Sequence, residues 1–331
     1  MNNFNYLYNK LIFGIDEAQL IEGGNAITNA SKISQQNVET TVSDIYHLII
    51  NKLFPSLPTS VVFPLGSTGK KLPSSYSGDL DLGFDVTKLK QHKMYANMST
   101  KDIIHKVVDF ITNTYNNFGS EIWINDIIPN IIHFGFPITN TAKLADQNDK
   151  IVQVDIIFTE TPEMTKFYMS SPYEWESQFK GAHRNCLLNA IAKNDHYQVL
   201  KHDSNTNIDT MWEIEEVEMD GLIITTKTIV DPKTGKYMKY KDTDEDLSPA
   251  YAKILKQKII SQDPEQITKT LFGESFNTTQ INTFEQVFDI IKNNDEFKFK
   301  DSKDQILKEA AKDILSRIKK LKFPEILREY L

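Results

Sequence analysis

The sequence predicts an α+β fold in which a mixed β-sheet is flanked by helices and is followed by a mostly helical C-terminal domain. Three observations support this prediction. Runs of branched and aromatic residues, above all 61–65 and 151–158, have the composition of buried strands. Apolar residues recur at helical spacing in 38–54 and again after Ser99, among these strands. From Ser248 onward the spacing is helical.

These patterns divide the chain into four segments. Its 331 residues are enough for two domains, and a hydrophobic content of 40% supplies their cores. We expect an N-terminal extension at 1–34, a sheet-containing domain at 35–200, a β-hairpin insertion at 201–245 and a helical domain at 246–331.

In the sheet-containing domain, each element has its own signal. The helix over 38–54 ends before Pro55, which cannot continue it. Ser99 and Asp102 have the spacing of a capping box and start a second helix. The strands of this domain are expected at 61–65, 79–84, 121–126, 131–138 and 151–158.

Outside this domain the sequence predicts a hairpin and several helices. The segments 212–219 and 221–230 are strand-like, and the turn motif 231–235 leads from the second of them into 236–240. The acids of 212–219 could mark a metal site, but their alternation favours the solvated face of a strand. The helices are expected at 6–22, 250–261, 264–272, 279–293 and 302–321.

The segment 66–81 carries the strongest functional signal. Gly66 and Ser67 directly follow a strand, where a turn can bind phosphate. Asp79 and Asp81 share one face of the next strand, because side chains alternate along a strand. Two such carboxylates repel each other unless a cation lies between them. Mg²⁺ is commonly bound by a few carboxylates together with substrate phosphates.

A third acid extends this pattern. Asp155 is a lone carboxylate in the apolar strand 151–158, where an acid is costly unless it is paired, hydrogen-bonded or bound to metal. Next to Asp79 and Asp81 it would complete a site for two metal ions, which stabilises in-line displacement at phosphorus. Each piece alone also fits a simpler explanation, namely a solvated strand edge, an ordinary turn or a structural acid. Their combination favours nucleotidyl transfer.

The combined motifs resemble the nucleotidyltransferase superfamily typified by DNA polymerase beta. Its hG[GS], Dh[DE]h and h[DE]h motifs match Leu65-Gly66-Ser67, Asp79-Leu80-Asp81-Leu82 and Val154-Asp155-Ile156. The polymerase beta branch is matched further by Ser77-Gly78 and by Tyr168-Met169-Ser170-Ser171, which is similar to the Tyr-Phe-Thr-Gly segment that faces the incoming sugar. The resemblance covers residues 50–192 and implies a nucleotidyltransferase palm.

The resemblance also implies roles for individual residues. Asp79, Asp81 and Asp155 would be the catalytic acids and the ligands of two Mg²⁺ ions, for which Mn²⁺ can substitute. Asp155 would in addition help to activate the acceptor hydroxyl as a general base. The residues that would bind the nucleotide are Gly66, Ser67, Lys70, Lys71, Ser77, Gly78 and Tyr168.

The chain also departs from that family. Its loop before the acids is longer, so either Lys70 or Lys71 could be the phosphate-binding cation. Elements for gripping duplex DNA are not found before residue 60, so templated synthesis is not implied. Further on, Lys180 and Arg184 lie at a predicted helix start, where backbone donors favour anions. They are candidate nucleotide contacts, and a solvated helix face is the alternative.

Composition limits the classes of function. The net charge of −8 argues against a protein that coats nucleic acid nonspecifically. A single cysteine, Cys186, excludes an internal disulfide and favours a reducing compartment, so we expect a cytoplasmic protein. No apolar run approaches the ~18 residues of a membrane span, and the polar N-terminus does not have the pattern of a secretory signal. No membrane partner is therefore expected.

The predicted function is Mg²⁺-dependent transfer of a nucleoside monophosphate from an NTP to an acceptor hydroxyl, with release of pyrophosphate. The expected acceptor is a nucleic-acid 3′ end, such as that of tRNA, another RNA or DNA. Within the superfamily, the alternatives are a synthase of cyclic oligonucleotides and an enzyme that modifies a protein hydroxyl. A non-catalytic nucleotide-binding scaffold is the alternative of another class.

Overall fold

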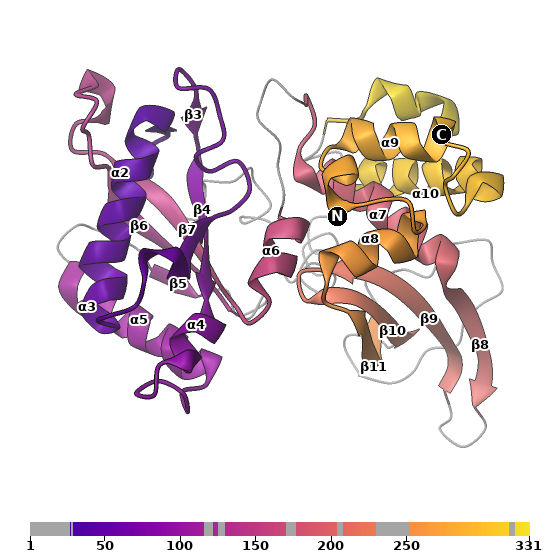
Figure 1. The fold of residues 1–331 in the computed structure, drawn as a ribbon, viewed down its shortest axis with the longest axis horizontal. Helices are drawn as coiled ribbons and strands as arrows, with labels where there is room; N and C mark the ends of the chain where they lie inside the picture. Colours follow the sequence, from indigo (N-terminus) through magenta and orange to yellow (C-terminus); the bar gives the residue numbers. More distant parts are fainter. Residues whose placement is uncertain are drawn as a thin grey trace, which may run out of the picture. The chain divides into compact units, whose positions relative to one another are not determined.

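The protein is described by a computed structural model, shown in Figure 1. The described residues are 27, 29–115, 122–124, 130–169, 177–203, 208–229, 252–317 and 322–331. They form two compact units, an N-terminal unit that ends at Gln178 and a C-terminal unit that begins at Phe179. The helix expected at 6–22 and the turn expected at 231–235 lie outside the described residues.

A five-stranded sheet forms the centre of the N-terminal unit. Its order is β2-β4-β7-β6-β5, and only β4 and β7 are parallel to each other, so the sheet is mixed as expected. The α+β class with a mixed sheet is thereby confirmed. The strands are β2 (Val62–Pro64), β4 (Asp79–Asp85), β5 (Ile122–Ile124), β6 (Ile131–Pro137) and β7 (Ile151–Thr159).

Helices cover one face of this sheet (Figure 1). The first begins as α2 (Gln35–Ile45) and continues through a π-helical turn, η2 (Tyr46–Ile50), into α3 (Asn51–Leu53). The second is α5 (Thr100–Tyr115). The capping box at its start is confirmed, because the backbone N–H groups of Ser99 and Asp102 each donate to the side chain of the other residue, over 3.2 and 3.1 Å.

The pleat of the central strands separates an apolar face from a polar one. Leu80 and Leu82 of β4, like Val154 and Ile156 of β7, are fully buried in the core that these helices form with the sheet. Since side chains alternate, the acids of β4 and β7 must lie on the opposite face. The packing of the apolar residues therefore determines where the acids point.

The loop before the acids is tied to the start of α2. The two-residue strand β1 (Ile33–Ser34) pairs with β3 (Tyr76–Ser77), and the Gln35 backbone N–H donates to the Ser75 carbonyl over 3.0 Å. Just before β1, the Ser31 N–H donates to the Ile151 carbonyl over 2.7 Å. The described end of the expected extension 1–34 is thus hydrogen-bonded to the N-terminal unit. Two short helices complete this unit, α4 (Val86–Gln91) and α6 (Pro162–Tyr168).

The C-terminal unit combines helices with a second sheet. Its four antiparallel strands have the order β11-β10-β9-β8, and β9 and β10 cover nearly all of the segments 212–219 and 221–230 that were expected to be strand-like. Its elements are α7 (Gly181–Asp195), β8 (Tyr197–Asp203), β9 (Ile208–Glu218), β10 (Gly221–Ile229), β11 (Ala252–Ser261), α8 (Pro264–Phe272), α9 (Phe284–Asn293) and α10 (Lys303–Ser316). No helix among the described residues has the length and apolarity that crossing a bilayer requires.

Two sequence-based expectations need correction here. The helix expected at 250–261 is wrong, because this segment forms the edge strand β11, which pairs with β10. Its branched residues fit a strand, and tertiary pairing outweighs their helical spacing. The expected boundary at residue 200 also differs from the structure, in which α7 already belongs to the C-terminal unit.

One acid of β9 lies inside the C-terminal unit. Glu215 is only 4% exposed, and its backbone N–H donates to the His196 carbonyl over 3.0 Å. Burial, helped by the negative charge of Asp195, raises the pKa of Glu215 to about 7, while His196 and Lys298 act in the opposite direction. Asp195 itself forms an ion pair of 3.0 Å with Lys298.

This pKa predicts a pH-dependent stability. Between pH ~4.5, the ordinary value of a glutamate, and about 7, folded Glu215 holds a proton that the unfolded chain releases, so its contribution to stability falls as pH rises. We expect Glu215→Gln to remove this slope, giving a variant with a higher unfolding midpoint than the wild type at pH 8 and a similar one at pH 4.5. Denaturant titrations at both pH values measure it. A variant that is less stable than the wild type at pH 8 would contradict this assignment.

Candidate active site

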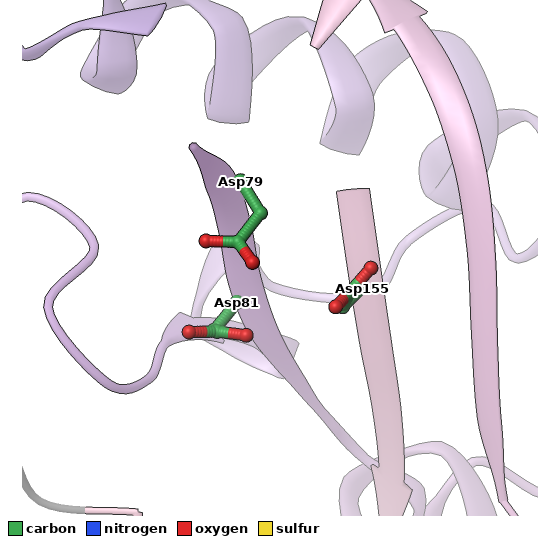
Figure 2. Close-up of side chains that lie close together, drawn as sticks. All are labelled: Asp79, Asp81 and Asp155. Atoms are coloured by element: carbon green, nitrogen blue, oxygen red, sulfur yellow. The ribbon is translucent and has the colours of Figure 1, made fainter. Parts of the chain in front are cut away.

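Three carboxylates converge on the polar face of the N-terminal sheet. In the parallel pair of β4 and β7, Asp81 is in register with Asp155, and Asp79 is in register with Gln153. One carboxylate oxygen from each acid lies within 4.8 Å of those of the other two. Figure 2 shows Asp79 and Asp81 on one strand and Asp155 on its neighbour, with their carboxyl groups close together. The expected convergence of the acids is therefore present.

Crowding of these acids has an electrostatic cost. Burial, followed by the negative charges of Asp79 and Asp155, raises the pKa of Asp81 well above its ordinary value, while the Lys71 ammonium lowers it. A divalent cation among the three carboxylates would relieve this repulsion. The all-oxygen donor set also suits hard cations such as Mg²⁺. Among the described residues, this is the only group of three or more acids, histidines or cysteines whose geometry suits a metal ion.

The Gly-Ser turn lies directly beside Asp81. The Leu65 N–H donates to the Asp81 carbonyl, and the Asp81 N–H donates to the Thr68 hydroxyl oxygen, both over 2.9 Å. Gly66 has a φ of +52°, and a Cβ atom there would lie 2.6 Å from the Asp81 carboxylate. Both the backbone conformation and the close approach therefore require glycine. The turn and Asp81 are therefore joined by two hydrogen bonds and by the close approach at Gly66.

The sugar-facing candidate segment reaches the same turn. Tyr168 ends α6, and the carbonyl of the next residue, Met169, accepts a hydrogen bond of 3.1 Å from the Gly66 N–H. Tyr168 is half-buried. The rest of the expected segment, Ser170 and Ser171, lies outside the described residues. The structure thus joins the start of this segment to the Gly-Ser turn.

The two lysines of the loop can now be compared. Lys71 donates to the Tyr76 carbonyl over 3.2 Å, and its charge acts on Asp81. Lys70 follows the turn, and its backbone N–H donates to the Ser67 carbonyl over 3.1 Å. The influence of Lys71 on Asp81 makes Lys71 the first candidate for the phosphate-binding cation.

The other predicted nucleotide contacts have different surroundings. Ser77 is only 2% exposed, and its hydroxyl oxygen accepts a 2.7 Å hydrogen bond from the Gln35 side-chain amide. Gly78 is half-buried and directly precedes Asp79. Lys180 and Arg184 belong to the C-terminal unit, at the start of α7. Arg184 is only 1% exposed in that unit, so it does not lie on a solvated helix face, which was the alternative to a nucleotide contact.

Two neighbours of Asp155 were not identified from the sequence. His133 lies opposite Asp155 on β6, and its Nδ1 atom is 2.8 Å from Asp155 Oδ1. The Gln153 amide donates to the same oxygen over 2.9 Å. Both residues are polar positions in otherwise apolar strands, and this was the available signal. That His133 would face Asp155 depended on the pairing of β6 with β7.

Comparisons of this chain with protein families, with curated proteins and with solved structures give no match. The resemblance to nucleotidyltransferases consequently rests on the quoted motifs, and the reasoning about function rests on the geometry of the site.

Proposed function

We propose that this protein is a Mg²⁺-dependent nucleotidyltransferase, which transfers a nucleoside monophosphate from an NTP to an acceptor hydroxyl and releases pyrophosphate. The observation that carries the proposal is the convergence of Asp79, Asp81 and Asp155 beside the Gly-Ser turn. These three acids would hold the metal. When bound, Mg²⁺ supplies a positive charge that stabilises the attacking and leaving oxygens of the transfer.

The residues around the acids have complementary tasks in this proposal. The Ser67 hydroxyl and the Lys71 ammonium would bind the triphosphate and neutralise part of its charge. The acids stand on central strands of a packed sheet, so their positions are defined before substrate binds. Catalysis would then depend on positioning and on charge stabilisation, which are the main contributions available to a phosphoryl-transfer enzyme.

The acids also argue against a scaffold that only binds nucleotides. Asp81 has its pKa raised by its surroundings, and Asp79 and Asp155 add to this rise. A protein with no use for a cation would be relieved of this repulsion by replacing one acid with an amide. The crowded carboxylates therefore favour an enzyme.

Replacement of the acids tests the proposed chemistry. We expect Asp79→Asn and Asp155→Asn each to lower the rate of pyrophosphate release by more than about 100-fold, since even outer-shell changes at metal sites cost 10–100-fold. Asp149→Asn, at an exposed position with a φ of +53° that asparagine tolerates, is the matched control and should keep full activity. Circular dichroism would verify folding. Near-normal release by either active-site variant rules out the assignment.

The two lysines give a second test. We expect Lys71→Ala to raise the KM for NTP by roughly 10-fold to 100-fold, the effect of losing one hydrogen bond to a charged group. Lys70→Ala tests the other candidate cation, and we expect a smaller rise in KM, because the charge of Lys71 acts on Asp81. Steady-state kinetics at saturating Mg²⁺ separate the variants. A larger effect at Lys70 would reverse the assignment.

The acceptor is tested by product analysis. We propose a nucleic-acid 3′ end, in particular that of tRNA or another RNA, because the quoted motifs are most similar to enzymes that extend such ends. Labelled NTPs would be incubated with RNA, DNA, a protein mixture or no acceptor. We expect label on the RNA 3′ end. RNA whose 3′ end has been oxidised with periodate before the incubation should receive no label. Labelled cyclic product in the tube without acceptor would instead identify a cyclic-oligonucleotide synthase.

A further inference from the structure

One oxygen of Asp155 is held by two side chains. Asp155 Oδ1 lies 2.8 Å from His133 Nδ1 and accepts a 2.9 Å hydrogen bond from Gln153 Nε2. The two donors come from different directions, since His133 lies opposite Asp155 on β6 and Gln153 precedes it on the same face of β7. We name His133 and Gln153 the Asp155 clamp.

The direction of the His133 hydrogen bond depends on the imidazole tautomer. An ionised carboxylate only accepts hydrogen bonds, so the tautomer that pairs with ionised Asp155 carries its hydrogen on His133 Nδ1. The Gln153 amide is oriented by its other end, because its Oε1 atom accepts a 3.2 Å hydrogen bond from the Ile27 N–H. Gln153 is 2% exposed, so water has little access to compete for these groups. The Gln153 donor is therefore preset toward Asp155.

These contacts leave the two oxygens of Asp155 unequal. A carboxylate oxygen has about two lone-pair positions. The clamp occupies both positions on Oδ1, which leaves Oδ2 as the oxygen available to a cation. Hydrogen-bonded neighbours of this kind orient metal ligands and tune their affinity.

We infer that His133 and Gln153 are positioning residues, which hold Asp155 so that it binds metal through Oδ2 alone. This inference rests on the proposed function, because it requires Asp155 to be a metal ligand. Asp155 would then be a ligand through a single oxygen, fixed in direction by the clamp. The competing explanation is that the clamp only satisfies a half-buried acid, with no effect on metal binding.

Metal affinity distinguishes these explanations without measuring activity. Mn²⁺ would be titrated into the purified full-length protein, and free Mn²⁺ would be followed by electron paramagnetic resonance. His133→Phe keeps the ring shape and removes the donor, and we expect it to weaken Mn²⁺ binding about 10-fold or more. His133→Asn returns an N–H group near the position of Nδ1, and its affinity should return to within about 3-fold of the wild type.

The variant Gln153→Met provides a second, independent test of the clamp. It removes the other donor at similar side-chain length, and we expect it also to weaken Mn²⁺ binding about 10-fold. The clamp is disproved if the variants that fold, judged by thermal unfolding, bind Mn²⁺ within about twofold of the wild type. A His133→Asn variant that binds Mn²⁺ no better than His133→Phe would likewise overturn the role assigned to the donor.

Measuring both Mn²⁺ affinity and pyrophosphate release allows the clamp inference and the proposed function to fail separately. Wild-type protein that binds Mn²⁺ but releases no pyrophosphate from any NTP would refute nucleotidyl transfer, while the comparison of affinities would still decide the clamp. If Asp155→Asn leaves Mn²⁺ affinity unchanged, Asp155 is not a ligand, and the clamp inference is wrong whatever the enzyme does.

Discussion

The register between strands β4 and β7 is the constraint on which the candidate active site depends. In this parallel pair Asp81 lies beside Asp155, with Asp79 one pleat further along the same face. A slip of one residue would turn the acids of one strand into the apolar core. Burial of Leu80, Leu82, Val154 and Ile156 excludes that slip, so the same packing that stabilises the sheet also places three like charges together.

Placing like charges together has an energetic cost, and the surrounding residues are arranged to accommodate it. The Lys71 ammonium acts against the rise in the pKa of Asp81. The backbone of Asp81 is hydrogen-bonded on both sides to the Gly-Ser turn, and Asp155 is held by His133 and Gln153. These hydrogen bonds hold the backbone of Asp81 and one carboxylate oxygen of Asp155 in place. Such a preorganised group of acids is suited to a cation and to the phosphates that accompany it.

The C-terminal unit shows where sequence patterns are least reliable for assigning secondary structure and domain membership. The segment of β11 was expected to be a helix, since its apolar residues also fit helical spacing, but it pairs with β10 at the edge of a sheet. The choice between these structures depends on a partner strand that lies distant in the sequence. For the same reason the sequence placed α7 in the sheet-containing domain, whereas its contacts place it in the C-terminal unit.

The sequence by itself determined the strands of the N-terminal sheet, the capping box of α5, and which acids and which turn are candidates for the site. These features depend on local alternation and on residues close in the chain, such as Asp79 and Asp81. Only the tertiary structure decided that Asp155 joins them, that Lys71 acts on Asp81, and that His133 faces Asp155. The physical reason is that these relations depend on strand order and register, which long-range packing establishes.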